Sequence, residues 1–161
     1  MLGTLADVLA DAAPLLRWGA VQVGRHGSRL CLMAVPPGRP LPGPVLWHWQ
    51  RQARLALPGA GVLRLQRDPW GDVDLAQLPA VLQLRWRSGG ERIQAGGLRR
   101  DVKALLREAQ WPAWQRDAVP LLCADTDVMS PVLAVADLIV ADTIAATKAS
   151  TDRGRFIWQQ D

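Results

Sequence analysis

The sequence predicts an α+β fold made of small β-rich domains with few short helices. Apolar and polar residues alternate in short segments such as VLQLRWR at 81–87, a pattern typical of half-buried strands. Proline and glycine turn signals separate these segments, and the best helical periodicity lies in RRDVKALLREAQ at 99–110. The chain has 161 residues, of which 49% are hydrophobic and 21% charged. These values exclude a wholly disordered chain and allow one good core or two small ones.

The N-terminal segments favour a helix followed by strands. Apolar residues at 2–13 recur with helical spacing, so residues 1–14 are predicted to be a helix remnant. Residues 15–35 predict two strands around the turn-rich tetrapeptide at 25–28. Residues 36–44, PPGRPLPGP, exclude helix and central strand. They form either a stiff surface loop or a proline-rich ligand for a partner's aromatic groove.

Further strands complete the first half of the chain. VLWHWQ at 45–50 places Val45, Trp47 and Trp49 on one side of a strand. ARLALPGAGVLRLQ at 53–66 predicts a strand, a Pro-Gly turn and a second strand. Residues 15–67 are therefore expected to form a meander of about five strands, and the polar segment 68–79 to form a junction.

The second half contains the predicted helix. A strand at 81–87 and a glycine-rich loop at 88–97 lead into residues 99–110, which Pro112 ends. The buried stripe of this helix is predicted to be Val102, Leu105, Leu106 and Ala109. Its opposite side is predicted to carry four cations, Arg99, Arg100, Lys103 and Arg107.

The remaining segments predict short elements. AWQRDAV at 113–119 indicates a short helix or turn, and residues 121–124 a strand. Asp125 and Asp127 are expected to be solvated carboxylates of a turn. VLAVADLIVA at 132–141 predicts a strand or a bent strand pair, and FIW at 156–158 a closing strand.

Cysteine usage and the absence of targeting signals predict a soluble cytoplasmic chain. Cys31 and Cys123 are each flanked by apolar residues and are expected to be buried thiols. The two cysteines and two histidines show no zinc spacing, so we expect no metal site. The N-terminus has no basic region, and Asp137 interrupts the longest apolar run near the C-terminus. We therefore expect no signal peptide and no membrane span.

The charge balance has two explanations. The chain has 17 Arg and 2 Lys against 13 Asp and 2 Glu, with a net charge of +4. A GC-rich genome replaces Lys with Arg, and composition alone favours this explanation. A phosphate-binding surface also uses Arg, because its planar fork matches phosphate oxygens. Six cations cluster between residues 92 and 116: Arg92, Arg99, Arg100, Lys103, Arg107 and Arg116.

That cluster is either a solvated helix face or a nucleic-acid interface. Two neighbouring features support the interface. Gly89, Gly90, Gly96 and Gly97 would let the backbone approach a phosphate chain closely. Trp86, Trp111 and Trp114 would stack on bases or, alternatively, belong to the core.

Catalytic patterns are lacking in the sequence. The segment SGGER at 88–92 begins like a pyrophosphate-binding loop, but the Asp-Ser pair of such loops is missing. No nucleophile elbow occurs, and the two histidines show no pairing with a nucleophile. We therefore predict no catalytic residue and no cofactor bound by this chain.

The segment RRDVKALLREAQWPAWQRDAVPLL resembles the C-terminal domain of tRNA(Ile)-lysidine synthetase. The similarity is strong over 81–122 and weaker over the rest of the chain. The matching positions are Arg100, Lys103, Leu105, Glu108, Pro112, Trp114, Arg116, Asp117, Pro120, Leu121 and Leu122. Asp101 departs from a position that is often cationic in the family, and Asp137 from one that is often glycine.

The resemblance implies both a fold and a function. The family ligates lysine to the wobble cytidine of an isoleucine tRNA with a CAU anticodon, using ATP in an N-terminal PP-loop domain. Residues 15–78 would be a middle β-rich substrate-binding region. Residues 79–161 would be a tRNA-binding domain like one in the phenylalanyl-tRNA synthetase β subunit. The chain lacks the PP-loop pattern, so alone it is expected to be inactive and to bind neither ATP nor lysine.

The resemblance also implies roles for single residues. Phosphates of the acceptor-stem region would contact Arg92, Arg99, Arg100, Lys103 and Arg107. Arg116 and Asp117 would pair and pin the turn after Trp114, while Pro112, Trp114 and Pro120 would be structural. The expected partners are the tRNA and the N-terminal catalytic domain of the same enzyme, with a homodimer as a further expectation. The alternative function is a protein-interaction or dimerisation module without RNA binding.

Overall fold

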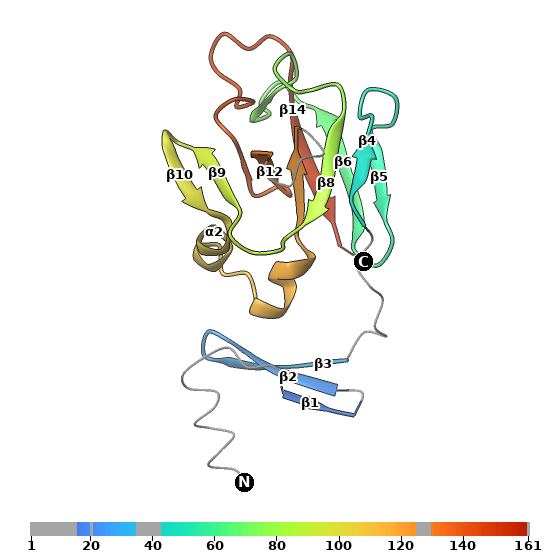
Figure 1. Ribbon diagram of the computed structural model, residues 1–161, viewed down its shortest axis with the longest axis vertical. Coiled ribbons are helices and arrows are strands. Elements are labelled where there is room, and N and C mark those ends of the chain that lie inside the picture. Colours follow the sequence, from blue (N-terminus) through green and yellow to red (C-terminus); the bar gives the residue numbers. More distant parts are fainter. Residues whose placement is uncertain (1–15, 20, 35–42, 125–129, 161) are drawn as a thin grey trace.

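The computed structural model describes residues 16–19, 21–34, 43–124 and 130–160 (Figure 1). The predicted helix at 2–13, the turn carboxylates Asp125 and Asp127 and most of the proline-rich loop lie outside these residues. The described part consists mainly of antiparallel strands with one short α-helix, which confirms the predicted β-rich α+β class.

The first three strands form a separate antiparallel sheet. They are β1 (Leu16–Trp18), β2 (Val21–His26) and β3 (Arg29–Ala34), paired in the order β1-β2-β3. Two strands were predicted here. The third exists because Gly19 takes a φ of +60°, which a glycine adopts without strain, and reverses the chain after Trp18. One face of the sheet is apolar and exposed, with Trp18 at 89% of its maximal exposure.

The main unit contains two sheets that face each other across one hydrophobic core. The five-stranded sheet has the order β13-β12-β11-β8-β4, and the four-stranded sheet the order β5-β6-β14-β7. The rings of Trp47 and Phe156, one from each sheet, lie 6.1 Å apart between centroids and join the two layers. Figure 1 shows the strands of both sheets beside one another.

The four-stranded sheet has one buried and one exposed face. Its strands are β5 (Arg54–Leu57), β6 (Gly61–Arg67), β7 (Val73–Asp74) and β14 (Arg153–Gln159). Burial alternates along β14, where Gly154, Phe156 and Trp158 point into the core. The predicted closing strand FIW is confirmed as part of β14, which lies between β6 and β7.

Two strands of the five-stranded sheet are buried on both faces. This sheet contains β4 (Val45–Trp47), β8 (Leu82–Trp86), β11 (Pro120–Cys123), β12 (Val132–Val135) and β13 (Ile139–Val140). All residues of β11 and β12 are buried, as their uninterrupted apolar sequences require. Cys123 is buried as predicted, whereas Cys31 is only half-buried. The bent strand pair predicted at 132–141 is confirmed as β12 and β13.

The sheets cross the predicted domain boundary between residues 78 and 79. Strand β4 pairs with β8, and β6 pairs with β14 over six residue pairs. Residues 45–67 therefore complete sheets whose other strands lie after residue 79. A division at 78/79 would break the hydrogen bonds of both sheets, so the main unit begins before β4 and not at residue 79.

A β-hairpin and the α-helix accompany the five-stranded sheet. The hairpin consists of β9 (Arg92–Ala95) and β10 (Leu98–Asp101), and α2 (Val102–Glu108) follows directly. The predicted helix start at residue 99 is therefore wrong, since Arg99 and Arg100 are strand residues. Asp101 caps the helix, because its Oδ1 accepts a hydrogen bond from Ala104 N at 3.0 Å. This role explains a carboxylate where the family pattern is often cationic.

The helix ends before Pro112 through a left-handed residue. Gln110 takes a φ of +60°, and its N–H and that of Trp111 donate to Arg107 O and Leu106 O. This is a Schellman motif in which glutamine replaces the usual glycine. Val102, Leu105 and Leu106 are buried as predicted, but Ala109 is exposed because it already lies in the cap. The 3₁₀ helix η1 (Ala113–Ala118) then confirms the short helix predicted at 113–119.

Candidate nucleic-acid interface

The hairpin register divides its arginines between two faces. Directly opposite residues of an antiparallel pair lie on the same face, and residues two apart share that face. Arg99 is opposite Gln94, and Arg100 is opposite Ile93, which is buried. Arg92 and Arg99 therefore share the exposed face, and Arg100 lies on the other. The predicted row of four cations on one helix side does not exist.

Arg100 is engaged within the protein. Its Nη2 donates to Glu108 Oε2 at 2.5 Å and thus ties β10 to the end of α2. The pair is partly exposed, so it contributes little to stability. It nevertheless neutralises the guanidinium, and Arg100 is a weaker candidate for phosphate contact than the sequence indicated.

Helix α2 presents two cations on its exposed side. Lys103 and Arg107 are four residues apart and exposed, so they lie one turn above each other. Among the described residues, neither of them forms an ion pair, and the same holds for Arg92 and Arg99. These four are the predicted phosphate-binding residues that remain free to bind an external anion.

The glycine-rich turns already hold carboxylates of the protein itself. Glu91 Oε1 accepts hydrogen bonds from the backbone N–H of Ser88 and of Gly89, the latter at 2.9 Å. Asp142 accepts from Gly96 N at 2.7 Å and from Gly97 N at 2.8 Å. We expected these glycines to let the backbone bind phosphate. The N–H groups of Gly89, Gly96 and Gly97 do not meet this expectation, because each already donates to a carboxylate of the protein. Nor are the N–H groups of Ser88 and Gly89 free to cradle a pyrophosphate.

The Glu91 carboxylate stays ionised in this loop. Burial by itself raises the pKa of Glu91, but hydrogen bonds from the backbone of Ser88, Glu91 and Gly89 and from the Ser88 hydroxyl outweigh it, so the pKa is lowered. Its Oε2 lies 3.8 Å from Arg87 Nε, and this ion pair is shielded, since the two side chains are only 7% and 9% exposed.

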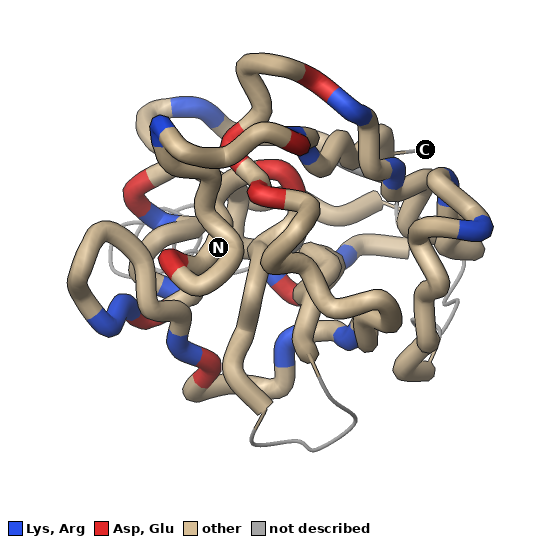
Figure 2. Tube along the Cα trace, turned by 90° about the horizontal axis from the view of Figure 1, so that it is seen from above, with Lys and Arg blue, Asp and Glu red and all other residues tan. Residues whose placement is uncertain are grey.

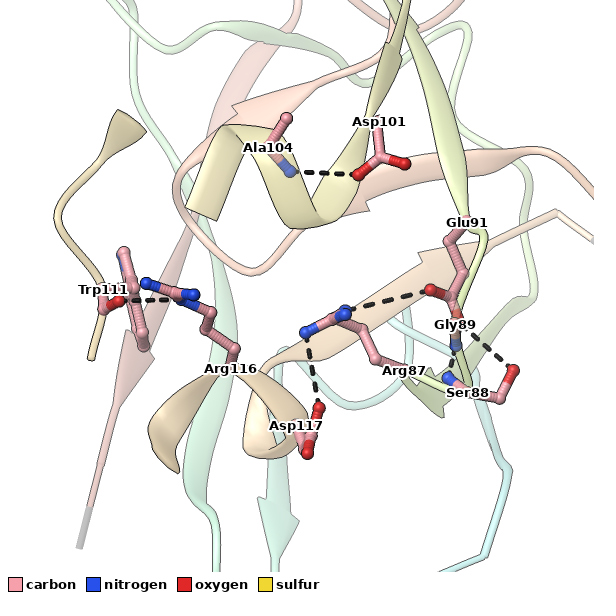
Figure 3. A network of polar contacts seen from close by, with 9 residues as sticks. All are labelled: Arg87, Ser88, Gly89, Glu91, Asp101, Ala104, Trp111, Arg116 and Asp117. Carbon is pink, nitrogen blue, oxygen red and sulfur yellow. Dashed lines mark hydrogen bonds and ion pairs between the residues drawn. The ribbon is translucent and has the colours of Figure 1, made fainter. Parts of the chain in front are cut away.

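The predicted pair between Arg116 and Asp117 does not form. Arg116 Nε donates to Trp111 O at 2.9 Å, whereas Asp117 accepts from Arg87 Nη1 at 3.4 Å (Figure 3). Neighbouring residues of a 3₁₀ helix point about 120° apart, so they face different partners. Both residues are structural, as predicted, but they hold η1 through two separate contacts.

Arg116 of η1 lies in the positive field of two other arginines, Arg107 and Arg87. Partial burial, followed by repulsion from Arg107 and then from Arg87, lowers the pKa of Arg116. The guanidinium remains a cation, because arginine does not lose its proton in proteins. The repulsion between Arg107 and Arg116 means that their positive charges act together on an anion that approaches this end of the helix.

The proline and tryptophan residues of the motif serve packing. Pro112 caps η1, and Pro120 is buried at the start of β11. Trp111 stacks on Trp158 with ring centroids 5.5 Å apart and planes only 4° from parallel. Trp86 also packs against the core. Of the two roles predicted for these tryptophans, the structure favours packing for Trp111 and Trp86. The Trp114 side chain lies outside the described part.

A basic hollow that the sequence did not reveal lies beside the hairpin. Its volume is about 470 Å³, and its lining residues include three arginines, Arg85, Arg92 and Arg99. Arg85 was not predicted to be functional. Alternation along β8 places Arg85 on the same side as Gln83 and opposite Leu84, and this period-two pattern was the available signal.

The surface as a whole does not carry one sign of charge. Figure 2 shows Lys and Arg intermingled with Asp and Glu along the trace.

Among the described residues, no group of three or more His, Cys, Asp or Glu side chains is arranged to hold a metal ion. No helix of the described part is long and apolar enough to cross a membrane.

Comparison with known proteins identifies relatives across most of the chain. Residues 82–158 match the family of the TilS substrate C-terminal domain. The tRNA(Ile)-lysidine synthase of Xylella fastidiosa is 31% identical over 153 residues, which cover 92% of this chain and 32% of that protein. That of Xanthomonas axonopodis pv. citri is 34% identical over 85% of this chain and 29% of that protein. That of Methylococcus capsulatus is 28% identical over 78% of this chain and 29% of that protein.

A solved structure shares this similarity. The crystal structure of a TilS C-terminal domain aligns with a TM-score of 0.49 and 24% identity, covering 67% of this chain and 89% of that one. The chain spans about a third of the length of the curated relatives it matches. The chain therefore belongs to the tRNA(Ile)-lysidine synthase family, and its residues 82–158 are the TilS substrate C-terminal domain of that family.

Proposed function

We propose that this chain is the tRNA-gripping portion of a tRNA(Ile)-lysidine synthase and binds the acceptor-stem backbone of an isoleucine tRNA. The observation that carries the proposal is a set of four exposed cations that form no ion pair with any described residue, Arg92, Arg99, Lys103 and Arg107. All four lie within one hairpin and the helix that follows it, inside the segment that matches the family.

The contacts are of the kind that position a nucleic acid without reading its sequence. Guanidinium and ammonium groups bind phosphate oxygens, and the resulting affinity depends on salt because counterions are released. The β9–β10 hairpin and α2 set the backbone positions of the four cations, so only their side chains need to be ordered on binding. Arg100, paired with Glu108, is proposed to organise this surface and not to bind phosphate.

The proposal includes a second domain, which would carry out the chemistry of the whole enzyme. The ATP-dependent ligation of lysine to the wobble cytidine of the tRNA is assigned to a PP-loop domain, with which this chain would act as a partner. ATP and lysine would bind there and not to this chain. The proposal places the protein in the cytoplasm, in keeping with the free thiols of Cys31 and Cys123.

Salt-dependent tRNA binding tests the proposal. The dissociation constant for a tRNA(Ile) transcript is measured between 50 and 200 mM salt, and four phosphate contacts predict a log–log slope of about −3 to −4. The double variant Lys103→Glu/Arg107→Glu should weaken binding about 10- to 100-fold and reduce the slope by about two. Circular dichroism checks that the fold is intact.

A matched control separates the interface from net charge. Arg51→Glu/Lys148→Glu changes the net charge by the same amount at two exposed residues on other loops, neither of which pairs with an acidic side chain in the described part of the chain. Its affinity should fall much less. Equal losses in the two double variants would show that α2 is no particular interface. A chain that ignores RNA and forms a tight dimer by light scattering would favour the alternative, an interaction module.

A further inference from the structure

The basic hollow is lined by two separate stretches of the chain, 85–99 and 130–132. Arg85 comes from β8, Gly89 and Gly90 from the loop after β8, Arg92 and Arg99 from the hairpin, and Ser130 from the residues before β12. A phosphate within an RNA strand carries a sugar on both sides and therefore lies best on an open surface. A terminal phosphate carries a sugar on one side only and can therefore enter a hollow with its free oxygens first.

The three arginines make the hollow strongly attractive for a dianion. Arg92 and Arg99 share one hairpin face, and neither forms an ion pair with a described residue. Arg85 is oriented by a hydrogen bond of 3.1 Å from its Nη2 to Ser130 O. Guanidinium groups bind phosphate oxygens through charge-assisted, often bidentate hydrogen bonds.

Among the described residues, one acidic residue lines the hollow, and its charge is already compensated. Glu91 Oε1 accepts the N–H groups of Ser88 and Gly89, and Oε2 faces Arg87. Its charge is therefore directed into its own loop, and three arginines stand against this one carboxylate among the described lining residues.

We propose that this hollow binds a terminal phosphate monoester, namely the 5′-phosphate of the RNA. The inference rests on the proposed function and extends it from backbone contacts to recognition of an RNA end. A monoester carries up to two negative charges and three terminal oxygens, against one charge and two oxygens for a backbone diester. Arg85, Arg92 and Arg99 together match the larger charge and number of acceptors.

The experiment compares RNAs that differ only at the 5′ end. Binding of a tRNA(Ile) transcript with a 5′-monophosphate is measured beside the same transcript with a 5′-hydroxyl. We expect the phosphorylated RNA to bind roughly tenfold more tightly. In Arg92→Gln/Arg99→Gln this preference should disappear. In Lys103→Gln/Arg107→Gln both RNAs should bind more weakly, while the preference remains.

Short probes separate the hollow from the rest of the interface. A 5′-phosphorylated tetranucleotide should compete better than its 5′-hydroxyl counterpart or than inorganic phosphate, since the end of an RNA and not the free ion is the proposed ligand. Equal competition by inorganic phosphate would reduce the hollow to a general anion site and overturn the proposal. Equal affinity of wild-type protein for both transcripts, or a preference that survives in Arg92→Gln/Arg99→Gln, would also overturn it.

Failure of the proposed function has a different signature. If neither transcript binds, the proposed function is wrong. The tetranucleotide comparison then tests the hollow by itself, and equal affinities for the two tetranucleotides would refute this inference too. If both transcripts bind with a steep salt dependence but equal affinity, only the inference about the 5′-phosphate is refuted.

Discussion

Replacing Asp142 with alanine should loosen the hairpin that carries Arg92 and Arg99. The carboxylate of Asp142 accepts hydrogen bonds from Gly96 N at 2.7 Å and Gly97 N at 2.8 Å, and its own N–H donates to Gln94 O. Bonds to a charged group contribute about 1.5–3 kcal/mol each. Because the side chain is exposed, we take about 1 kcal/mol for each bond, so Asp142→Ala should lower the free energy of unfolding by about 2 kcal/mol.

Urea unfolding followed by tryptophan fluorescence measures this loss. With a denaturant slope of about 2 kcal/mol per M, the midpoint should fall by about 1 M. Asp142→Asn keeps one acceptor oxygen and should lie between wild type and Asp142→Ala. Asp72→Ala removes an exposed carboxylate for which no side-chain bond exists among the described residues, and it should leave the midpoint unchanged. A midpoint for Asp142→Ala equal to that of Asp72→Ala would refute the role of this carboxylate.

Two further predictions concern the helix end and acid stability. Gln110→Gly should relieve the left-handed strain at φ +60°, which stabilises the fold by about 1 kcal/mol and raises the melting temperature by about 2–4 °C. The control Gln115→Gly, in η1, should lower the melting temperature. A lower melting temperature for both variants would contradict this explanation. The lowered pKa of Glu91 means that the unfolded state binds more protons in acid, so this residue stabilises the fold above the ordinary glutamate pKa of about 4.3 and the contribution is lost as the pH falls. Stability measured by urea unfolding between about pH 5 and 3 should therefore fall more steeply for wild type than for Glu91→Gln, and parallel curves would contradict the assignment.

The charged residues within the matched segment 82–158 have different tasks. Arg87, Glu91, Asp101 and Asp142 hold backbone N–H groups or secondary-structure elements in place. A charge count over the segment 92–116 treats all its charges alike. The arrangement of partners shows that only part of this positive charge is free to meet a nucleic acid.

The β-rich class, most of the strands, three of the four residues of the apolar stripe of α2 and the family could be predicted from the amino-acid sequence. These features depend on local periodicity or on a contiguous motif, and both are visible without coordinates. The sequence also placed Lys103 and Arg107 correctly on the exposed side of the helix. The prediction for Arg99 and Arg100 was wrong because Asp101 was not recognised as the N-cap of the helix. Without that boundary, the basic end of strand β10 was read as the first turn of α2.

Only the tertiary structure decided which charges are free and how the sheets are built. The partner of Gly96 is Asp142, 46 residues away, and β14 enters the sheet beside β6, whose residues precede the motif. No local period encodes such pairings, because they depend on how separate strands come together. The basic hollow likewise requires residues 130–132 to meet the stretch 85–99, so its binding capacity is a property of the fold and not of either stretch alone.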